Sequence, residues 1–192
     1  MSHDQLISEI KEGSQSAFRA LVQEFQNRVY NTCLSILQNQ VEAEETAQDV
    51  FIEVYRSISD FRGDSKLSTW IYRIATTKSL ELIRKNKRQK RFAFLQSLTG
   101  SKDQKGVDLA GFDHPGVLME QQENAAVLFK AIAQLPEAQK VAFTLHKVEG
   151  LAYQDICEIM ETSLSSVESL MFRAKKNLQI SLKYYYEKNF KD

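Results

Sequence analysis

Residues 61–91 read FRGDSKLSTWIYRIATTKSLELIRKNKRQKR: a short polar loop, an amphipathic stretch and a dense cationic end. After the loop, apolar residues recur at three- and four-residue steps, which is the spacing of one helix face. They are Leu67, Trp70, Ile71, Ile74 and Ala75. Asp64 or Ser65 suits the N-cap position of this helix, because a short side-chain oxygen can accept from its first free N–H groups. The stretch therefore predicts a helix that starts beside a polar loop and ends in positive charge.

Charge is segregated along this stretch. Between Thr76 and Arg91 there are seven lysines and arginines against one acid, Glu81. The whole chain of 192 residues has 25 basic and 25 acidic side chains, so its formal net charge is zero. A locally basic surface on a neutral protein indicates nucleic-acid binding better than a high overall pI does. A polar loop and an aromatic ring can also receive an unstacked base, so the combination suits opened DNA.

The composition is that of an ordinary helical globular protein with one large or two small domains. It has 43% hydrophobic residues but only 7 glycines and 2 prolines, which favours long helices. Cys33 and Cys157 lie far apart in apolar patterns and the three histidines do not cluster, so we expect no disulfide, metal site or cofactor. The first 13 residues do not resemble a signal peptide, and no apolar run approaches the ~20 residues that span a bilayer. We expect a soluble, cytoplasmic protein that is not itself a membrane protein.

Two more helical patterns precede residue 61 and predict a small three-helix bundle. Their apolar residues are Phe18, Leu21, Val22, Phe25, Val29, Cys33, Ile36 and Leu37 in the first, and Ala43, Ala47, Val50, Phe51, Val54, Tyr55 and Ile58 in the second. Between residues 100 and 116 the period is lost and four of the seven glycines occur, which predicts a flexible linker.

Helical spacing returns after the linker, and Pro136 is expected in the first turn of a helix that stops near Gly150. Residues 151–178 then read as two helices separated by a polar break at 161–163. Such a pair is typical of a helix-turn-helix, a motif whose second helix enters the DNA major groove. The chain is thus expected to be all-α, with two small domains.

Three blocks of this sequence resemble the extracytoplasmic-function (group 4) RNA polymerase sigma factors, the compact members with only regions 2 and 4. EAEETAQDVFIEVYRSI (42–58) is similar to region 2.2, and FRGDSKLSTWIYRIA (61–75) to regions 2.3 and 2.4. AQLPEAQ (133–139), followed by EGLAYQDICEIM and FRAKKNL, is similar to region 4. The resemblance implies region 2 at 1–95, a linker at 96–120 and region 4 at 121–192. It implies a factor without catalytic activity that binds core polymerase, recognises −10 and −35 promoter elements and promotes DNA melting.

The resemblance also assigns partners. Region 2.2 docks on the β′ clamp helices of core polymerase and region 4 is expected at the β flap; whether an anti-sigma factor also binds is left open. The polar positions that match region 2.2 are Glu44, Glu45, Gln48, Asp49 and Glu53. From Met1 to Phe61 ten acids face four lysines and arginines, a surface that repels DNA but suits a basic protein partner. Without the resemblance, the same residues read as a solvated helix face.

The −10 contacts implied by the resemblance centre on a pocket for a flipped base at the polar loop. The candidates are Phe61, Arg62, Gly63, Asp64, Ser65, Lys66, Trp70, Arg73, Lys78, Arg84, Lys85 and Arg88. Gly63 permits close approach of the backbone to a base. For Trp70, packing in the core and stacking on a base both remain open.

The −35 candidates lie on the second helix of the helix-turn-helix: Ser163, Ser165, Ser166, Glu168, Ser169, Arg173 and Lys176. Glu168 and Leu170 stand where many relatives carry basic residues, so −35 binding is expected to be weaker or differently specific. Glu168 could accept from a cytosine amino group, or it could close a capping box with Ser165.

Two other classes of protein compete with this interpretation. A simple helix-turn-helix regulator would bind duplex DNA tightly without polymerase, but it leaves 61–70 unexplained. A metal-dependent nuclease could use Glu44, Glu45 and Asp49, yet no histidine, lysine or glycine-rich partner lies near them in sequence.

Overall fold

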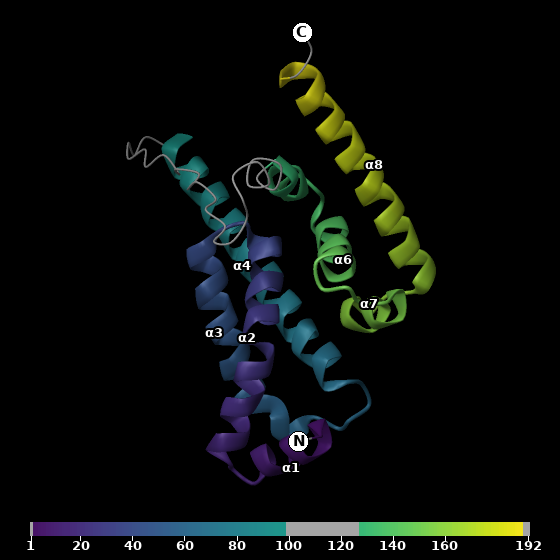
Figure 1. Ribbon diagram of the computed structural model, residues 1–192. Helices are drawn as coiled ribbons and strands as arrows, with labels where there is room; N and C mark the ends of the chain where they lie inside the picture. The colour runs from purple at the N-terminus through teal and green to yellow at the C-terminus, as the bar shows by residue number, and fades with distance from the viewer. Residues whose placement is uncertain (1, 99–126, 190–192) are drawn as a thin grey trace.

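The computed structural model describes residues 2–98 and 127–189, and every regular element in these ranges is a helix (Figure 1). The all-α prediction is confirmed. The elements are α1 (His3–Lys11), α2 (Gln15–Leu37), α3 (Gln40–Ser57), the 3-10 turn η1 (Ile58–Asp60), α4 (Leu67–Leu98), a helical segment at 127–133, α6 (Glu137–Lys147), α7 (Tyr153–Met160) and α8 (Leu164–Asn189). The predicted linker at 96–120 begins inside α4, and its residues from 99 onward lie outside the described ranges.

Helix α1 is an element that the apolar pattern did not predict. Its start is fixed by a capping box, in which Ser2 Oγ accepts from Gln5 N and Gln5 Oε1 accepts from Ser2 N, both at 3.3 Å. Leu6 and Ile10, one turn apart, are both buried. The helix is therefore held to the rest of the protein by two apolar side chains on one face.

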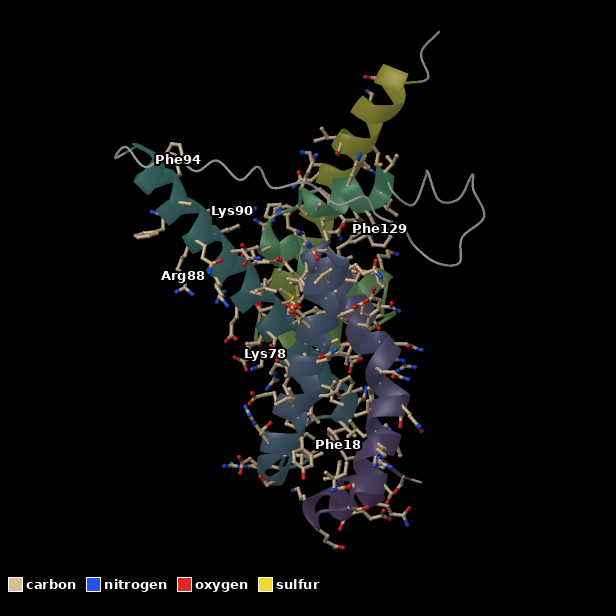
Figure 2. All side chains as sticks on the ribbon, turned by 90° about the vertical axis from the view of Figure 1, so that its left-hand side faces the viewer. Phe18, Lys78, Arg88, Lys90, Phe94 and Phe129 are labelled. Atoms are coloured by element: carbon tan, nitrogen blue, oxygen red, sulfur yellow. The ribbon has the colours of Figure 1, made fainter. Side chains whose placement is uncertain are left out.

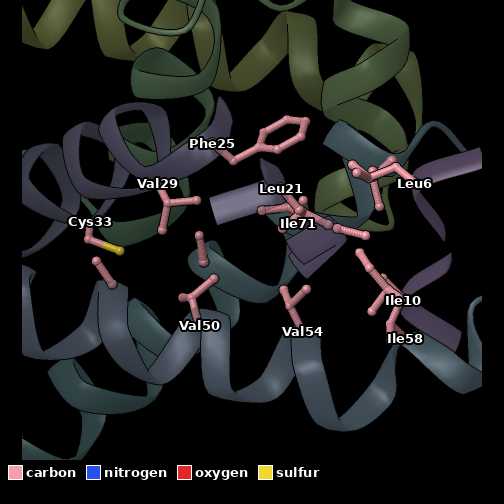
Figure 3. Packing of buried hydrophobic residues seen from close by; sticks show 14 of the residues in the cluster. Leu6, Ile10, Leu21, Phe25, Val29, Cys33, Val50, Val54, Ile58 and Ile71 are labelled. Atoms are coloured by element: carbon pink, nitrogen blue, oxygen red, sulfur yellow. The ribbon is translucent and has the colours of Figure 1, made fainter. Parts of the chain in front are cut away.

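The first core lies where α2, α3 and α4 pack against one another (Figure 3). Its main residues are Leu21, Phe25, Val29 and Cys33 from α2, Val50 and Val54 from α3, and Ile71 from α4. All of them belong to the predicted apolar faces. Cys33 is a free thiol, and burial raises its pKa to about 11, so it is expected to be unreactive.

The second unit is built from α6, α7, α8 and residues 127–133. Pro136 occupies the N-cap of α6, one residue before the predicted first turn. Residues 161–163 join α7 to α8, and Ile156, Val167 and Met171 pack between these two helices. The helix-turn-helix arrangement is therefore present as predicted.

The two units touch. Ile36 of α2 and Tyr72 of α4 are buried in one cluster with Val141, Leu145 and Ile156 of the second unit. In this arrangement α4 contacts α7 and α2 contacts α6. The C-terminal part of α4 continues past the bundle, with Arg88 and Lys90 on the projecting part (Figure 2). The structure thus leaves one end of α4 open and covers the other.

Candidate nucleic-acid interface

The polar loop at 61–66 is anchored at its first residue and open in its middle. Phe61 is buried, its ring lies 5.0 Å from that of Trp70, and its carbonyl accepts from Lys11 Nζ at 2.8 Å. Arg62, Gly63 and Asp64 are exposed. Gly63 has φ +80°, a conformation that strains other residues, and nothing lies within 4 Å of the place where a Cβ would stand. The loop therefore offers exposed polar groups and bare backbone at a fixed place.

The start of α4 differs from the prediction. The helix begins at Leu67, so Lys66 and not Asp64 or Ser65 is the residue before its first turn. Trp70 is half-buried against the first core, which supports the packing role for its ring.

Three of the cations predicted to bind DNA have protein partners in this arrangement. Lys66 Nζ lies 2.9 Å from Asp155 Oδ1, and Arg73 Nη2 donates to the Glu158 carbonyl at 2.6 Å. Both partners belong to α7. Lys78 Nζ lies 3.0 Å from Glu53 Oε2 on α3, so one ion pair joins a predicted DNA contact to a predicted polymerase contact.

Further along α4, three of the predicted DNA contacts have no such partners. Arg84, Lys85 and Arg88 are exposed and form no ion pair with any described residue. Arg88 is labelled on the projecting part of the helix in Figure 2. Lys87, which was not among the site candidates, lies 2.6 Å from Glu137 Oε1 at the start of α6. The open cationic surface is therefore the C-terminal half of α4.

The exposed face of α3 carries the predicted polymerase residues, but it is less purely acidic than expected. Glu44, Glu45, Gln48 and Asp49 are exposed. Exposed apolar residues share this face: Val41, Ile52 and Tyr55. Tyr55 had been assigned to the buried face of the helix, and that assignment is wrong, because 53% of the residue is exposed.

A hollow of about 410 Å³ lies between α2 and α3 at the same face. Its apolar lining is Phe18, Phe51, Ile52 and Tyr55, and the rings of Phe18 and Tyr55 are 4.9 Å apart. Arg19 and Arg56 also line it, with Gln15. The surface therefore combines acidic side chains with an apolar hollow rimmed by two cations.

On α8 the structure excludes one of the two roles considered for Glu168, the capping box. The N-cap is Ser163, whose Oγ accepts from Ser166 N at 3.3 Å. Ser165 therefore lies inside the first turn, and the proposed capping box with Glu168 is wrong. Glu168 is instead an exposed side chain that could meet a ligand.

The exposed part of α8 contains an aromatic residue that sequence reasoning missed. Glu168, Ser169, Phe172 and Arg173 line a shallow hollow, and Phe172 is 70% exposed. Arg173 Nε donates to the Ser169 carbonyl at 3.2 Å, which holds that side chain along the helix. The exposure of Phe172 could have been predicted from the sequence. Phe172 lies on the same helix face as Ser165 and Ser169, and this face is turned away from the buried Val167 and Met171.

A buried pair connects the two units behind this surface. The Tyr72 hydroxyl donates to Glu149 Oε2 at 2.8 Å. Burial raises the pKa of the Glu149 carboxyl, and burial together with this hydrogen bond raises that of the Tyr72 hydroxyl. Glu149 Oε1 and Arg73 Nε are buried without a hydrogen-bond partner among the described residues.

Two classes of site are missing from the described residues. No group of three or more histidine, cysteine or acidic side chains in these ranges could hold a metal ion, and Glu44, Glu45 and Asp49 form no such group. None of the described helices is long and apolar enough to cross a membrane.

The fold and the charged surfaces define a bipartite DNA-binding protein, and comparisons with known proteins identify its family. Sigma-70 region 2 matches residues 21–89, and Sigma-70, region 4 matches residues 126–178. The RNA polymerase sigma-H factor of Pseudomonas aeruginosa is 32% identical over 183 residues, which are 93% of this chain and 92% of that protein. The ECF RNA polymerase sigma-E factor of Haemophilus influenzae is 33% identical over 174 residues, 91% of this chain and 92% of that protein.

The chain belongs to the extracytoplasmic-function (ECF) sigma factors of the sigma-70 family, alternative sigma factors that initiate transcription. Solved structures share its fold. CnrH in complex with the cytosolic domain of CnrY matches with a TM-score of 0.68 at 18% identity, covering 93% of this chain and 96% of that one. The sigma factor RpoE of Bartonella quintana, in complex with the anti-sigma factor NepR, matches with a TM-score of 0.66 at 22% identity, covering 86% and 96%.

Proposed function

We propose that region 2 of this sigma factor captures the melted −10 element with the loop at 61–66 and the cationic half of α4. The observation that carries the proposal is the run of exposed cations Arg84, Lys85 and Arg88 in the C-terminal half of α4, which have no ion-pair partner among the described residues. Unstacking a base costs a few kcal/mol. A hydrogen bond to a charged group makes a net contribution of about 1.5–3 kcal/mol. A captured base and a few phosphate contacts can therefore offset the cost of unstacking without ATP.

Region 4 supplies the second DNA contact through the exposed face of α8. If this helix enters the major groove at the −35 element, Glu168 can accept from a cytosine amino group. Phe172 can contact a thymine methyl group, while Arg173 and Lys176 reach phosphates. With one acid and one exposed ring among the groups facing the bases, this surface would select a different sequence from a purely basic helix.

The exposed face of α3 is the proposed docking site for the β′ clamp helices of core polymerase. Glu44, Glu45, Gln48 and Asp49 give the electrostatic complement to a basic partner. Ile52 and Tyr55, together with the adjacent hollow, add apolar area that a solvated helix face does not need. By family resemblance alone, region 4 is proposed to meet the β flap.

The experiment uses holoenzyme assembled from the full chain and core RNA polymerase on a promoter found by mapping transcription start sites after overexpression. Bubble formation is followed by permanganate reactivity of −10 thymines. Scrambling residues 62–65 should abolish the bubble on duplex DNA, while polymerase binding is retained. Equal bubble formation by this variant would contradict the proposed role of the loop. Tight duplex binding without polymerase would instead favour a simple helix-turn-helix regulator.

A further inference from the structure

We infer that the hollow between α2 and α3 binds a small amphipathic organic anion, a molecule with an aromatic body and one carboxylate or sulfonate group. The binding site itself goes beyond the proposed function. Its consequence rests on that function: the hollow shares Ile52 and Tyr55 with the proposed docking face of α3, so a bound anion competes with core polymerase.

The first argument is the distribution of positive charge in this part of the chain. Residues 1–61 contain ten acids but only four lysines and arginines. Two of these four contact other groups of the protein. Lys11 Nζ donates to a backbone carbonyl at 2.8 Å, and Arg28 interacts with the hydroxyl–carboxylate pair that connects the two units. The other two, Arg19 and Arg56, are exposed, and both line the hollow.

No acidic side chain neutralises these two arginines within the described residues, although the surrounding surface has an excess of acid. The residues one helical turn from Arg19 are uncharged. Glu53, one turn before Arg56, is held by Lys78 at 3.0 Å. Asp60, one turn after Arg56, is exposed and forms no ion pair with a described residue. Two guanidinium groups, each able to bind a carboxylate or sulfonate through parallel hydrogen bonds, therefore stay available at one hollow.

The second argument is the apolar lining of the hollow. Phe18, labelled in Figure 2, comes from α2, while Phe51, Ile52 and Tyr55 come from α3. The rings of Phe18 and Tyr55 meet edge-on at 4.9 Å. Phe18 and Phe51 are half-buried, whereas 47% of Ile52 and 53% of Tyr55 are exposed. A ligand with an aromatic body would remove this exposed apolar surface from water and pack against the rings.

The third argument is the size of the hollow. Its volume of about 410 Å³ lies within the range of ~300–1,000 Å³ that is typical of pockets for small organic molecules. Such pockets combine an apolar lining with a few polar groups that fix the orientation of the ligand. Here the two guanidinium groups have that role. The hollow therefore suits a ligand of two or three rings with one anionic group.

The charges on the same face distinguish this ligand from the other partners of the chain. A nucleic acid is repelled by the excess of acid in residues 1–61. The basic partner that suits Glu44, Glu45 and Asp49 has the same sign of charge as the two arginines and does not neutralise them. The hollow and the acidic part of α3 thus require ligands of opposite charge, which favours a separate anion in the hollow.

Two probes that differ by one charged group test the site. 8-Anilinonaphthalene-1-sulfonate (ANS) and N-phenyl-1-naphthylamine have the same ring system, and only ANS carries a sulfonate. Each is titrated into the full chain and followed by its fluorescence. Arg19→Gln with Arg56→Gln should weaken ANS binding about 10-fold, equivalent to about 1.4 kcal/mol, and change binding of the neutral probe less than about 2-fold. Ile52→Gln should weaken binding of both probes, because it removes apolar lining.

The matched control is Lys90→Gln with Arg91→Gln, which removes the same charge from exposed sites on α4 outside the hollow and should leave ANS binding unchanged. Equal losses of ANS binding in the two double variants would mean that only net charge matters and would overturn the inference. Equal losses of both probes in the Arg19 and Arg56 variant would also overturn it. If neither probe binds but this variant weakens binding of core polymerase, the hollow receives an acidic side chain of polymerase, and the small-molecule site is refuted.

Competition with core polymerase tests the consequence. With ANS at about ten times its Kd, the apparent Kd of the parent chain for core polymerase should rise about 11-fold. For the Arg19→Gln, Arg56→Gln variant the rise should be only about 2-fold, because its ANS affinity is about 10-fold lower. An equal rise in both chains would place the effect of ANS on polymerase and would contradict the competition.

Failure of this inference and failure of the proposed docking face give different results. If ANS binds the hollow and leaves polymerase binding unchanged while Asp49→Lys weakens it, the competition is refuted and the docking face stands. If Asp49→Lys binds polymerase normally, the proposed docking face fails instead, and the probe titrations still decide whether the hollow binds an anion.

Discussion

The cationic half of α4 permits a quantitative prediction for Lys85→Ala with Arg88→Ala. Both side chains are exposed and neither has an ion-pair partner among the described residues, so their loss leaves no buried charge behind. Each phosphate contact contributes about 0.7 to the slope of log K against log salt for a single strand, or about 0.9 for a duplex. Losing both contacts should therefore reduce the slope by about 1.4 to 1.8.

This change in slope is large enough to measure. Between about 50 and 200 mM salt, a slope smaller by about 1.4 to 1.8 means that the parent loses roughly 7- to 12-fold more affinity than the variant. The assay is fluorescence anisotropy of holoenzyme on a fork-junction −10 DNA at a series of salt concentrations. Lys130→Ala with Lys183→Ala removes the same charge from exposed sites outside the proposed surface and should leave the slope unchanged. An unchanged slope for the α4 variant would remove these residues from the DNA surface.

Four further outcomes are expected. Asp49→Lys should weaken binding to core polymerase while the circular dichroism spectrum stays native. Normal binding would mean that the α3 face is an ordinary solvent-exposed surface and not a docking site. Phe172→Ala should weaken −35 recognition on a full promoter but leave binding to an isolated −10 fork unchanged; loss on both DNAs would contradict its assignment. Ile71→Ala, at a residue 1% exposed, should cost about 2–5 kcal/mol in urea denaturation, and a loss below about 1 kcal/mol would mean that this core is loosely packed. Because burial raises the pKa of Glu149, the packing of region 4 on region 2 should be most stable below that group's ordinary pKa of 4.5 and weaken as pH rises through the raised pKa. Glu149→Gln should remove this pH dependence, measured as energy transfer between dyes on α3 and α8, and a pH profile that it leaves intact would assign the effect to another group.

The groups that face Glu149 define what that pH experiment reports. The Tyr72 hydroxyl donates to the Glu149 carboxylate, and the positive charge of Arg28 lowers the pKa of Glu149. The negative charge of Glu149 in turn contributes to the raised pKa of the Cys33 thiol. Tyr72 and Cys33 both have raised pKa values and stay neutral in the acidic window. The Glu149→Gln variant therefore separates the contribution of Glu149 from that of the carboxylates that pair across the two units, Asp155, Glu161 and Glu137. Lys140, whose pKa is lowered by burial from 10.5, acts in the opposite direction at higher pH.

Helical periodicity predicted the fold well where the apolar face is long. The patterns on α2, α3 and α4 correspond to the buried residues of the first core, since three turns or more make the period unambiguous. Helix α1 was missed because it buries only Leu6 and Ile10 as large apolar residues, which is too few to show a period. Tyr55 was misplaced because it adjoins the buried Val54, and neighbours on a helix differ by about 100° in direction.

The candidate sites were harder to predict where several residues of one type compete. The run of serines around α8 offers three possible N-caps, and only the structure shows that Ser163 is used. The Tyr72–Glu149 and Lys66–Asp155 contacts join residues 77 and 89 positions apart, and no local pattern encodes such a pairing. The packing of region 4 on region 2 therefore depends on tertiary contacts that the sequence pattern could not reveal.

Helix α4 is one continuous rod from Leu67 to Leu98, and region 4 holds it near two distant points. Lys66 precedes its first turn and Lys87 lies 21 positions later, about 32 Å along the axis at 1.5 Å per residue. When one of these two ion pairs breaks, the other keeps the separated side chains close together. Their effective concentration stays high, so the broken pair re-forms rapidly. Displacement by a small competitor at either attachment should consequently be inefficient, whereas a large partner that engages both attachments together can separate region 4 from α4.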